Sequence, residues 1–382
     1  MSLERLSAFL AQDPGNPELA CEVFDLHFAA GHFAQARDTF AHLPEHALAL
    51  AGVRFRTARH DLVTGAYADA ETTLRNLAQS GYDSAAVAHD IAFAQLCQRN
   101  LAAAQTTVDA ALSRHEATSA LHVLRARIAL MRKDYVGAHA ALDAALRLDA
   151  DDATALGLRA LALLDAGEEA RATTAAAECL LRYPDQHEAL LAAGTASLWA
   201  GDSQSAERHY VRALDRFPNS GRALSGLGQC RMLAGDLEQA RVMLDRAIIA
   251  MPDHIGTWHA LGWMQLLSGE LDAAERSYRT ALELDRNFAE SHGGLAVVAL
   301  LDERHEEGEG AMKRALKLDP NSITGRYAQS LWLQHTGDQS GATAIFADLM
   351  RSGAMPGMSD EEAGVAAQRL RERATAHRGE RR

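Results

Sequence analysis

The sequence predicts an all-α fold of stacked antiparallel helical hairpins, and three observations support that prediction. The chain of 382 residues matches itself when it is shifted by 34 residues. Alanine is abundant and aromatic residues make up only 5% of the chain, a composition that suits closely packed helices better than strands. Apolar residues recur at helical spacing on both sides of a break in each unit. A single hairpin cannot bury its apolar face, so we expect the units to stack in one long array.

Ten units follow one another without an insertion. They span residues 17–356 and start at residues 17, 51, 85, 119, 153, 187, 221, 255, 289 and 323. The fifteenth place is glycine in seven of the ten units, as in Gly65 and Gly269, and we expect the two helices of a hairpin to be separated there. Proline at the thirty-second place ends the second helix in four units, at Pro184, Pro218, Pro252 and Pro320.

The eighth and twentieth places carry small residues, which predicts close contact between the two helices of a hairpin. The twentieth place is alanine in nine units and Gly308 in the other. Bulky residues such as Tyr210, Tyr278 and Phe346 are expected to fill the space toward the neighbouring unit.

The pattern is most complete at residues 258–285, which read WHALGWMQLLSGELDAAERSYRTALELD. It resembles the tetratricopeptide repeat family, whose signature spacing is occupied by Trp258, Leu261, Gly262, Gly269, Ala274, Tyr278 and Ala281. The resemblance covers about residues 17–356. It implies a right-handed superhelical solenoid in which the first helix of each unit lines a concave groove.

Both ends of the chain can be interpreted with the same 34-residue repeat. Residues 1–16 look like a truncated repeat that forms an N-terminal capping helix, because Pro14 falls in the proline phase of the repeat. Residues 357–382 predict a C-terminal capping helix and a basic tail, since Ser359 and Glu362 have capping-box spacing and the arginines come late.

The resemblance implies that places two, five, six, nine, twelve and thirteen of each first helix face the groove. The predicted partner-binding residues at these places are Arg56, Arg59, His89, Phe93, Arg127, Leu161, Trp199, Gln229, Met232, His259, Trp263, Tyr327 and Leu331. The set is basic near its start and aromatic further on, which predicts a protein or peptide partner with an acidic segment followed by apolar anchors. For any one of these residues, packing in the core is the alternative interpretation.

Composition argues against several other classes of function. The net charge of −13 disfavours a nucleic-acid-binding protein, and no apolar window is long enough to predict membrane insertion. The four cysteines lie far apart, so neither a zinc site nor a disulfide framework is expected, and a reducing, cytoplasmic location fits. The histidines form no HExxH motif, and we expect no metal and no cofactor.

The sequence therefore predicts a non-catalytic scaffold or chaperone-like adaptor that holds segments of partner proteins. The repeats occupy nearly the whole chain and leave no room for a catalytic module, although a reactive thiol at Cys97 would be an enzymatic alternative. The composition is typical of a bacterial protein and favours an accessory of secretion or envelope assembly. Two alternatives stay open: a self-associating structural protein that forms homo-oligomers, and a regulatory subunit associated with an enzyme.

Overall fold

The computed structural model describes residues 2–351, and all of the regular secondary structure in this range is helical. The first helices of the ten units are α2 (Pro17–Ala29), α5 (Ala51–Thr64), α7 (Ala85–Cys97), α9 (Ser119–Met131), α11 (Ala153–Asp165), α13 (His187–Trp199), α15 (Gly221–Leu233), α17 (Ile255–Leu267), α19 (Ala289–Leu301) and α21 (Ile323–Thr336). The second helices are α3 (Phe33–Asp38), α6 (Tyr67–Gln79), α8 (Leu101–Arg114), α10 (Tyr135–Leu148), α12 (Glu169–Arg182), α14 (Ser203–Arg216), α16 (Leu237–Ala250), α18 (Leu271–Leu284), α20 (His305–Leu318) and α22 (Gln339–Arg351).

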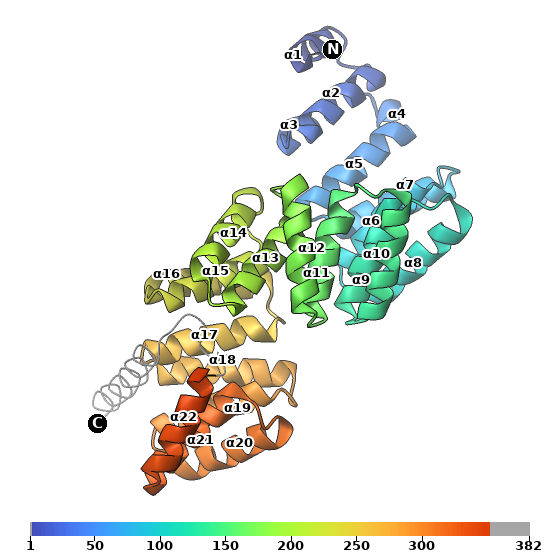
Figure 1. Cartoon of the computed structure of the whole chain (residues 1–382). Helices are drawn as coiled ribbons and strands as arrows, with labels where there is room; N and C mark the ends of the chain where they lie inside the picture. The colour runs from blue at the N-terminus through green and yellow to red at the C-terminus, as the bar shows by residue number, and fades with distance from the viewer. Residues whose placement is uncertain (1, 352–382) are drawn as a thin grey trace. The chain divides into compact units, whose positions relative to one another are not determined.

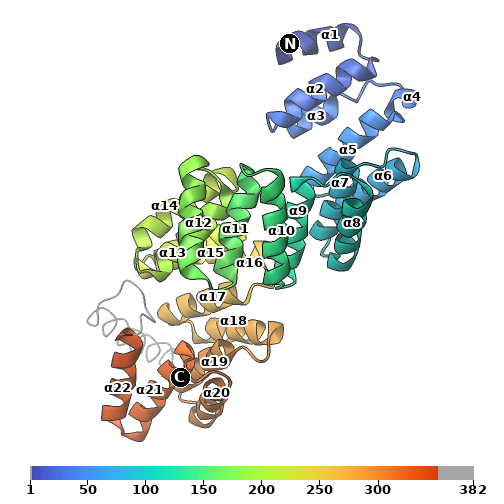
Figure 2. The same ribbon diagram turned by 45° about the vertical axis from the view of Figure 1, so that its right-hand side comes forward.

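The helical hairpin is the repeating element of this fold. Each first helix begins at the residue where the sequence repeat begins, and each second helix begins sixteen residues later. Paired helices such as α9 and α10 lie side by side and antiparallel (Figures 1 and 2). The predicted fold class, an all-α solenoid of stacked hairpins, is confirmed.

The chain divides into two compact units, Met1–Ala166 and Gly167–Arg382. We call these two parts the first unit and the second unit, which distinguishes them from the ten 34-residue units of the repeat. The boundary falls between the two helices of the fifth hairpin, α11 and α12. The sequence predicted one array and showed no sign of this division, because the 34-residue period continues across it. The predicted C-terminal capping helix at residues 357–382 lies outside the described residues.

The corner of every hairpin has a left-handed backbone at the fifteenth place. Glycine provides it in seven units, with φ between 76° at Gly31 and 91° at Gly337. The remaining three units place Arg99, Lys133 and Glu303 there, with φ of 60°, 59° and 63°. The corner geometry is therefore common to all ten units, whether or not glycine is present.

Two tyrosines show how small and large residues fit together in the second unit. A Cβ atom added to Gly194 would lie 2.8 Å from the ring of Tyr210, and one added to Gly226 would lie 2.1 Å from it. Tyr278 has the same relation to Gly262 and Gly294, at 2.7 Å and 2.5 Å. Each ring therefore fills the space between the first helix of its own hairpin and the first helix of the next, as the sequence predicted.

The first hairpin departs from the regular pattern. Its second helix, α3, ends at Asp38 after six residues, whereas the second helices of the other units have 13 or 14. The chain continues through turns to the short helix α4 (Glu45–Leu48), whose N-cap is Pro44. A further helix, α1 (Leu3–Gln12), precedes the first hairpin and packs on α2.

Candidate partner-binding surface

A cavity of about 240 Å³ lies on the first helices α7 and α9 and at the start of α11. It brings together three of the predicted groove residues, His89, Phe93 and Arg127. The other lining residues are Ala120, Val123, Leu124, Asp152 and Thr154. Apart from Asp152, all of these side chains occupy place two, five, six or nine of a first helix, so the cavity lies on the surface that the repeat assigns to partners.

Helix α7 contributes an imidazole and an aromatic ring to this cavity. The helix starts at a serine N-cap, with the hydroxyl of Ser84 accepting from the backbone N–H of Val87 at 3.3 Å. One helical turn separates His89 and Phe93, whose rings are nearly parallel with centroids 6.5 Å apart. The Nδ1 atom of His89 lies 2.9 Å from Oδ1 of Asp90, which orients the imidazole.

Asp152 lines the cavity, yet both of its carboxylate oxygens already accept hydrogen bonds that hold the helices in place. Its Oδ1 accepts from the backbone N–H groups of Thr154 and Ala155 at the start of α11. Its Oδ2 accepts from the hydroxyl of Ser119 at 2.5 Å, which ties the starts of α9 and α11 together. The cavity therefore combines an apolar wall, the Arg127 guanidinium and an imidazole, a set of groups suited to binding a side chain.

The same face continues onto α2 and α5, where the two predicted arginines have different surroundings. Arg56 is fully engaged with Asp25, with Nε 2.9 Å from Oδ1 and Nη2 2.5 Å from Oδ2. Arg59 is exposed, and its guanidinium carbon lies 5.3 Å from the ring centroid of Phe28 and 6.0 Å from that of Phe55. These are cation–π distances, so the two phenylalanines hold the Arg59 side chain in position.

Four of the predicted partner-binding side chains are buried and belong to the core. The exposed fractions are 7% for Leu161, 8% for His259, 3% for Tyr327 and 8% for Leu331. Side chains so enclosed stabilise the packing, and their burial does not support a partner-binding role for these four, which stays a prediction. A side chain at a given place of the repeat is therefore exposed in one hairpin and buried in another, according to the size of the residues around it.

The remaining predicted residues of the second unit keep some exposure. Trp199 is 50% exposed at the end of α13, and Gln229 and Met232 are half-buried on α15. Trp263 is also half-buried, packs against the core around α17–α22, and lies 5.9 Å from the ring of Tyr327. A partner-binding role for these residues stays a prediction.

The predicted set omitted the residues that form most of the cavity wall. Ala120, Val123, Leu124 and Thr154 occupy groove places, but they are small or aliphatic and resemble ordinary core residues in the sequence. Taking every groove place, whatever its residue type, would have identified all four. Asp152 lies one residue before α11 and could have been identified only as an N-cap.

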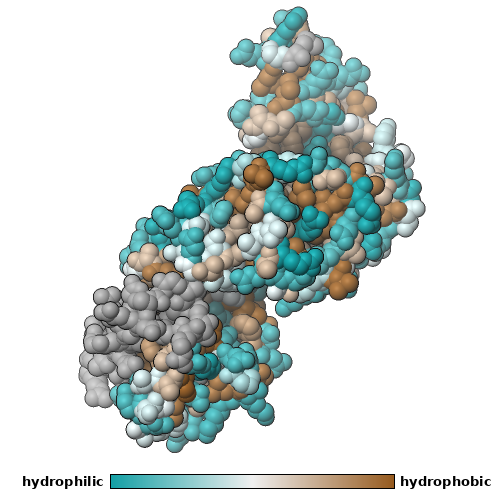
Figure 3. Space-filling model, in the orientation of Figure 1, coloured by the Kyte–Doolittle hydropathy of each residue, from teal (hydrophilic) through white to brown (hydrophobic). Residues whose placement is uncertain are grey.

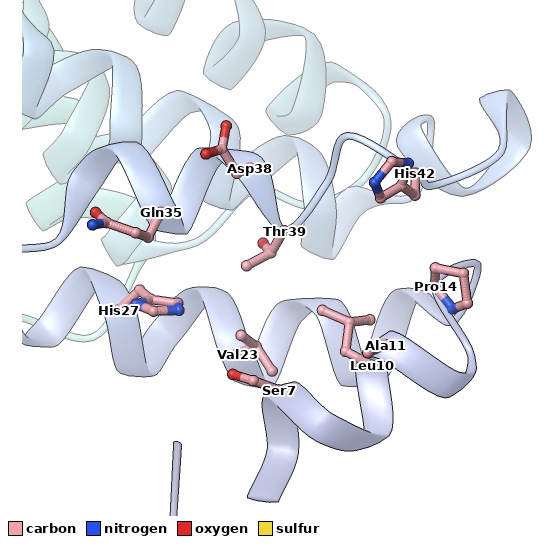
Figure 4. A pocket seen from close by; sticks show the side chains of 10 residues that line it. All are labelled: Ser7, Leu10, Ala11, Pro14, Val23, His27, Gln35, Asp38, Thr39 and His42. Atoms are coloured by element: carbon pink, nitrogen blue, oxygen red, sulfur yellow. The ribbon is translucent and has the colours of Figure 1, made fainter. Parts of the chain in front are cut away.

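A second, larger cavity lies at the N-terminal end of the chain and was not expected. Its volume is about 660 Å³, and its walls come from α1, α2, α3 and the turns that follow (Figure 4). Leu10 and Val23 lie on the lower helices, and the side chain of Thr39, the residue that follows α3, points toward them (Figure 4). The short length of α3 leaves this space uncovered, and no residue of the predicted groove lines it.

The two cysteines at groove places have thiols of low reactivity. Burial raises the pKa of Cys21 and of Cys97, and each is half-buried, so both thiols are protonated at neutral pH. Within residues 2–351, no three histidine, cysteine or acidic side chains come close enough to hold a metal ion. In the same range, every helix is too short or too polar to cross a membrane.

Comparison with known proteins identifies the repeat. Family models described as tetratricopeptide repeat match residues 89–153, 198–262 and 260–323, and the first of these ranges contains most of the α7–α9 cavity. No curated protein matches the sequence.

Several solved structures are similar to this chain, and the two with a TM-score above 0.5 share its fold. A monomeric IFIT1 mutant with Gppp-AAAA is similar over 94% of this chain and 91% of its own, with 15% identity and a TM-score of 0.55. The human IFIT1 dimer with m7Gppp-AAAA covers 89% and 90%, with 15% identity and a TM-score of 0.52. A tetratricopeptide repeat protein from Parabacteroides merdae covers 66% and 98%, with 12% identity and a TM-score of 0.43. With ten hairpins of constant period and matches to the repeat in three ranges, the chain belongs to the tetratricopeptide repeat family, whose members bind protein or peptide partners.

Proposed function

We propose that this protein is a non-catalytic scaffold that holds a segment of a partner protein on the first helices of its first unit. The observation that carries the proposal is the cavity on α7, α9 and α11, where His89, Phe93 and Arg127 from two helices meet around an apolar wall. Its volume of about 240 Å³ suits one large side chain of a peptide rather than a whole cofactor.

The surface composition supports a protein partner over a nucleic acid. The IFIT1 structures contain RNA oligonucleotides, but their likeness to this chain is one of fold. A groove that follows a phosphate backbone needs a continuous basic stripe. Here Asp25, Asp90 and Asp152 stand among the cations of the same face, and the chain carries a net charge of −13. Hydrophilic and apolar patches also alternate on the face drawn in Figure 3.

The absence of activated nucleophiles in the cavity supports a non-catalytic role. Neither a serine nor a cysteine lines it, and the one side-chain hydroxyl of its lining, that of Thr154, forms no hydrogen bond with the imidazole of His89. The cavity therefore has groups for recognition and none of the usual pairs for covalent chemistry.

We infer a cytoplasmic, chaperone-like adaptor in a bacterial cell, acting as an accessory of secretion or envelope assembly. The four cysteines are free thiols, which fits a reducing compartment. The alanine- and arginine-rich composition supports a bacterial source. The assignment to secretion or envelope assembly rests on association with similar scaffolds.

Affinity capture with a blocked cavity tests this function. Ala120 is exposed and lines the cavity, so Ala120→Glu introduces bulk and charge there without disturbing the core. We expect partner recovery from the native cell lysate to fall about tenfold or more, because a central anchor contributes about 2 kcal/mol to binding.

The matched control is Ala140→Glu, which makes the same change at an exposed alanine on α10, outside the cavity. Recovery is measured by quantitative mass spectrometry after circular dichroism has shown that both variants are folded. If the two variants recover the same partners in the same amounts, the cavity is not the binding site.

A further inference from the structure

The three consecutive first helices α5, α7 and α9 carry Arg59, Phe93 and Arg127 at the same place of the repeat, the ninth. The helices follow one another in contact, α5 against α7 and α7 against α9. Phe93 and Arg127 line the cavity, while Arg59 lies one helix away on the N-terminal side. A chain that crosses these helices therefore meets a cation first and the cavity next.

Arg59 has surroundings that allow its guanidinium to bind a carboxylate from a partner. Among the residues that the structure describes, no carboxylate forms an ion pair with Arg59, whereas its neighbour Arg56 is occupied by Asp25. Contact with the faces of Phe28 and Phe55 restrains its long side chain. A guanidinium that lies over a ring keeps N–H groups at its edge for a carboxylate, and the restraint lowers the entropy that binding costs.

The spacing between the two features can be expressed in residues of an extended peptide. Packed helices lie about 8–10 Å apart, and a cavity between α7 and α9 is one and a half such spacings from α5, about 12–15 Å. An extended chain advances about 3.3 Å per residue. The distance from Arg59 to the cavity therefore corresponds to about four residues.

We propose that the first unit binds an extended peptide segment with an aromatic or large aliphatic residue in the cavity and an acidic residue about four positions away on Arg59. The inference rests on the proposed scaffold function and specifies the partner that this scaffold selects. Charge complementarity favours it, because Arg59 is an exposed cation that forms no ion pair with any carboxylate of the described residues. The apolar anchor lies against the ring of Phe93, while Val123 and Leu124, which are 7% and 2% exposed, form the enclosed part of the cavity wall.

Binding of synthetic probes to the full-length chain tests the pattern. The main probe is a fluorescein-labelled peptide with one phenylalanine and a glutamate four positions away on each side, separated by serine and glycine; two glutamates make it independent of chain direction. Comparison probes replace both glutamates by lysine, or move them next to the phenylalanine. A labelled single-stranded oligoadenylate represents nucleic acid.

We expect saturable binding of the main probe by fluorescence anisotropy, with an affinity that decreases as salt increases. Arg59→Gln should weaken it about fivefold to tenfold, as expected for a charge-assisted hydrogen bond on a partly exposed site. The matched control Arg75→Gln removes an exposed arginine of α6 that already pairs with Glu71, and should leave the affinity unchanged. The lysine probe and the probe with adjacent glutamates should bind at least about fivefold more weakly.

Several results would overturn the proposal: no binding of the main probe up to millimolar concentration, equal binding of the lysine probe, tighter binding of oligoadenylate, or an unchanged affinity in Arg59→Gln. The capture experiment with Ala120→Glu separates this outcome from a failure of the scaffold function. If Ala120→Glu loses partners while the probes show no acidic preference, the cavity binds proteins and only the acidic pattern is wrong.

Discussion

His259 shows at the scale of one residue how a groove position becomes part of the core. Its Nε2 lies 2.9 Å from the hydroxyl of Ser291, and its ring contacts the edges of Tyr278 and Phe288 at centroid distances of 5.3 Å and 5.2 Å. Burial lowers the pKa of His259 to about 4, with a smaller opposing effect from Glu290. The imidazole is therefore neutral in the folded protein at pH 7.

The depressed pKa of His259 makes stability depend on pH. The unfolded chain takes up a proton at this histidine near pH 6.5 and the folded chain only near pH 4, so stability decreases as the pH falls through this range. Between pH 7 and pH 5 the loss should approach about 2 kcal/mol in the free energy of unfolding. The check is urea unfolding of the wild type and of His259→Gln, which removes the titration and keeps a donor for Ser291.

The control for this prediction is His42→Gln, because His42 is exposed. It should lose as much stability on acidification as the wild type, whereas His259→Gln should lose about 2 kcal/mol less. The same pH dependence in His259→Gln and the wild type would mean that another group is responsible.

At the scale of the element, the corner of the hairpin keeps the same backbone conformation in every repeat, although the residue at the fifteenth place is not always glycine. Arg99, Lys133 and Glu303 adopt the left-handed backbone that glycine adopts in the other units. A side chain with a Cβ atom is strained there, and the packed helices on both sides compensate for that strain. The sequence located all ten corners through the period, but it gave no indication that three of them carry strain.

Replacing one strained residue by glycine should stabilise the protein. Lys133→Gly removes the Cβ atom from a position with φ of 59°, and we expect the free energy of unfolding to rise by about 0.5–1 kcal/mol. Lys313→Gly makes the same exchange within the regular helix α20 and should lower it by about 1 kcal/mol. Chemical denaturation of the two variants checks the signs, and a decrease in both would contradict the strain.

Helix α3 shows how one short element creates a feature that the repeat does not predict. Pro44 lies where a regular second helix would continue, and the chain leaves the helical path after Asp38. The uncovered surface of α1 and α2 then becomes the N-terminal cavity. Pro44 is a local feature of the sequence, whereas the opening of a cavity depends on how α1 and α2 pack around the shortened helix.

At the scale of the whole molecule, the division into two compact units predicts that each has its own stability. In an array of stacked hairpins each hairpin contacts mainly the hairpins next to it, so a local defect weakens those neighbours most. The Tyr210 ring, enclosed by Gly194 and Gly226, lies in the second unit, and the cavity on α7 and α9 lies in the first.

A substitution beside Tyr210 should therefore affect the second unit alone. Gly226→Ala places a Cβ atom about 2.1 Å from the ring, and overpacking of this kind costs about 1–3 kcal/mol. Hydrogen exchange measured by mass spectrometry should become faster in α13–α16 and stay unchanged in α5–α10. Gly310→Ala, where nothing lies within 4 Å of the added Cβ atom, should accelerate neither region. Faster exchange in both units after Gly226→Ala would show that they unfold together.

The sequence by itself determined the period and the hairpin. These features depend on local chemistry that recurs every 34 residues: small residues where helices meet, a break at the fifteenth place, and apolar spacing along each helix. For this reason the start of each first helix could be inferred from the residues alone. The resemblance to the repeat family placed His89, Phe93 and Arg127 on the predicted groove, and the structure brings these three residues together at one cavity.

Only the tertiary structure decided which groove residues are open. Phe93 and Leu161 share the ninth place, yet Phe93 borders a cavity while Leu161 is buried, because exposure depends on the volume of neighbours from other units. The pairing of Arg56 with Asp25, which leaves Arg59 without an ion pair among the described residues, is likewise a contact between α2 and α5. A repeat pattern specifies positions along the chain, whereas packing across helices determines which side chains remain available.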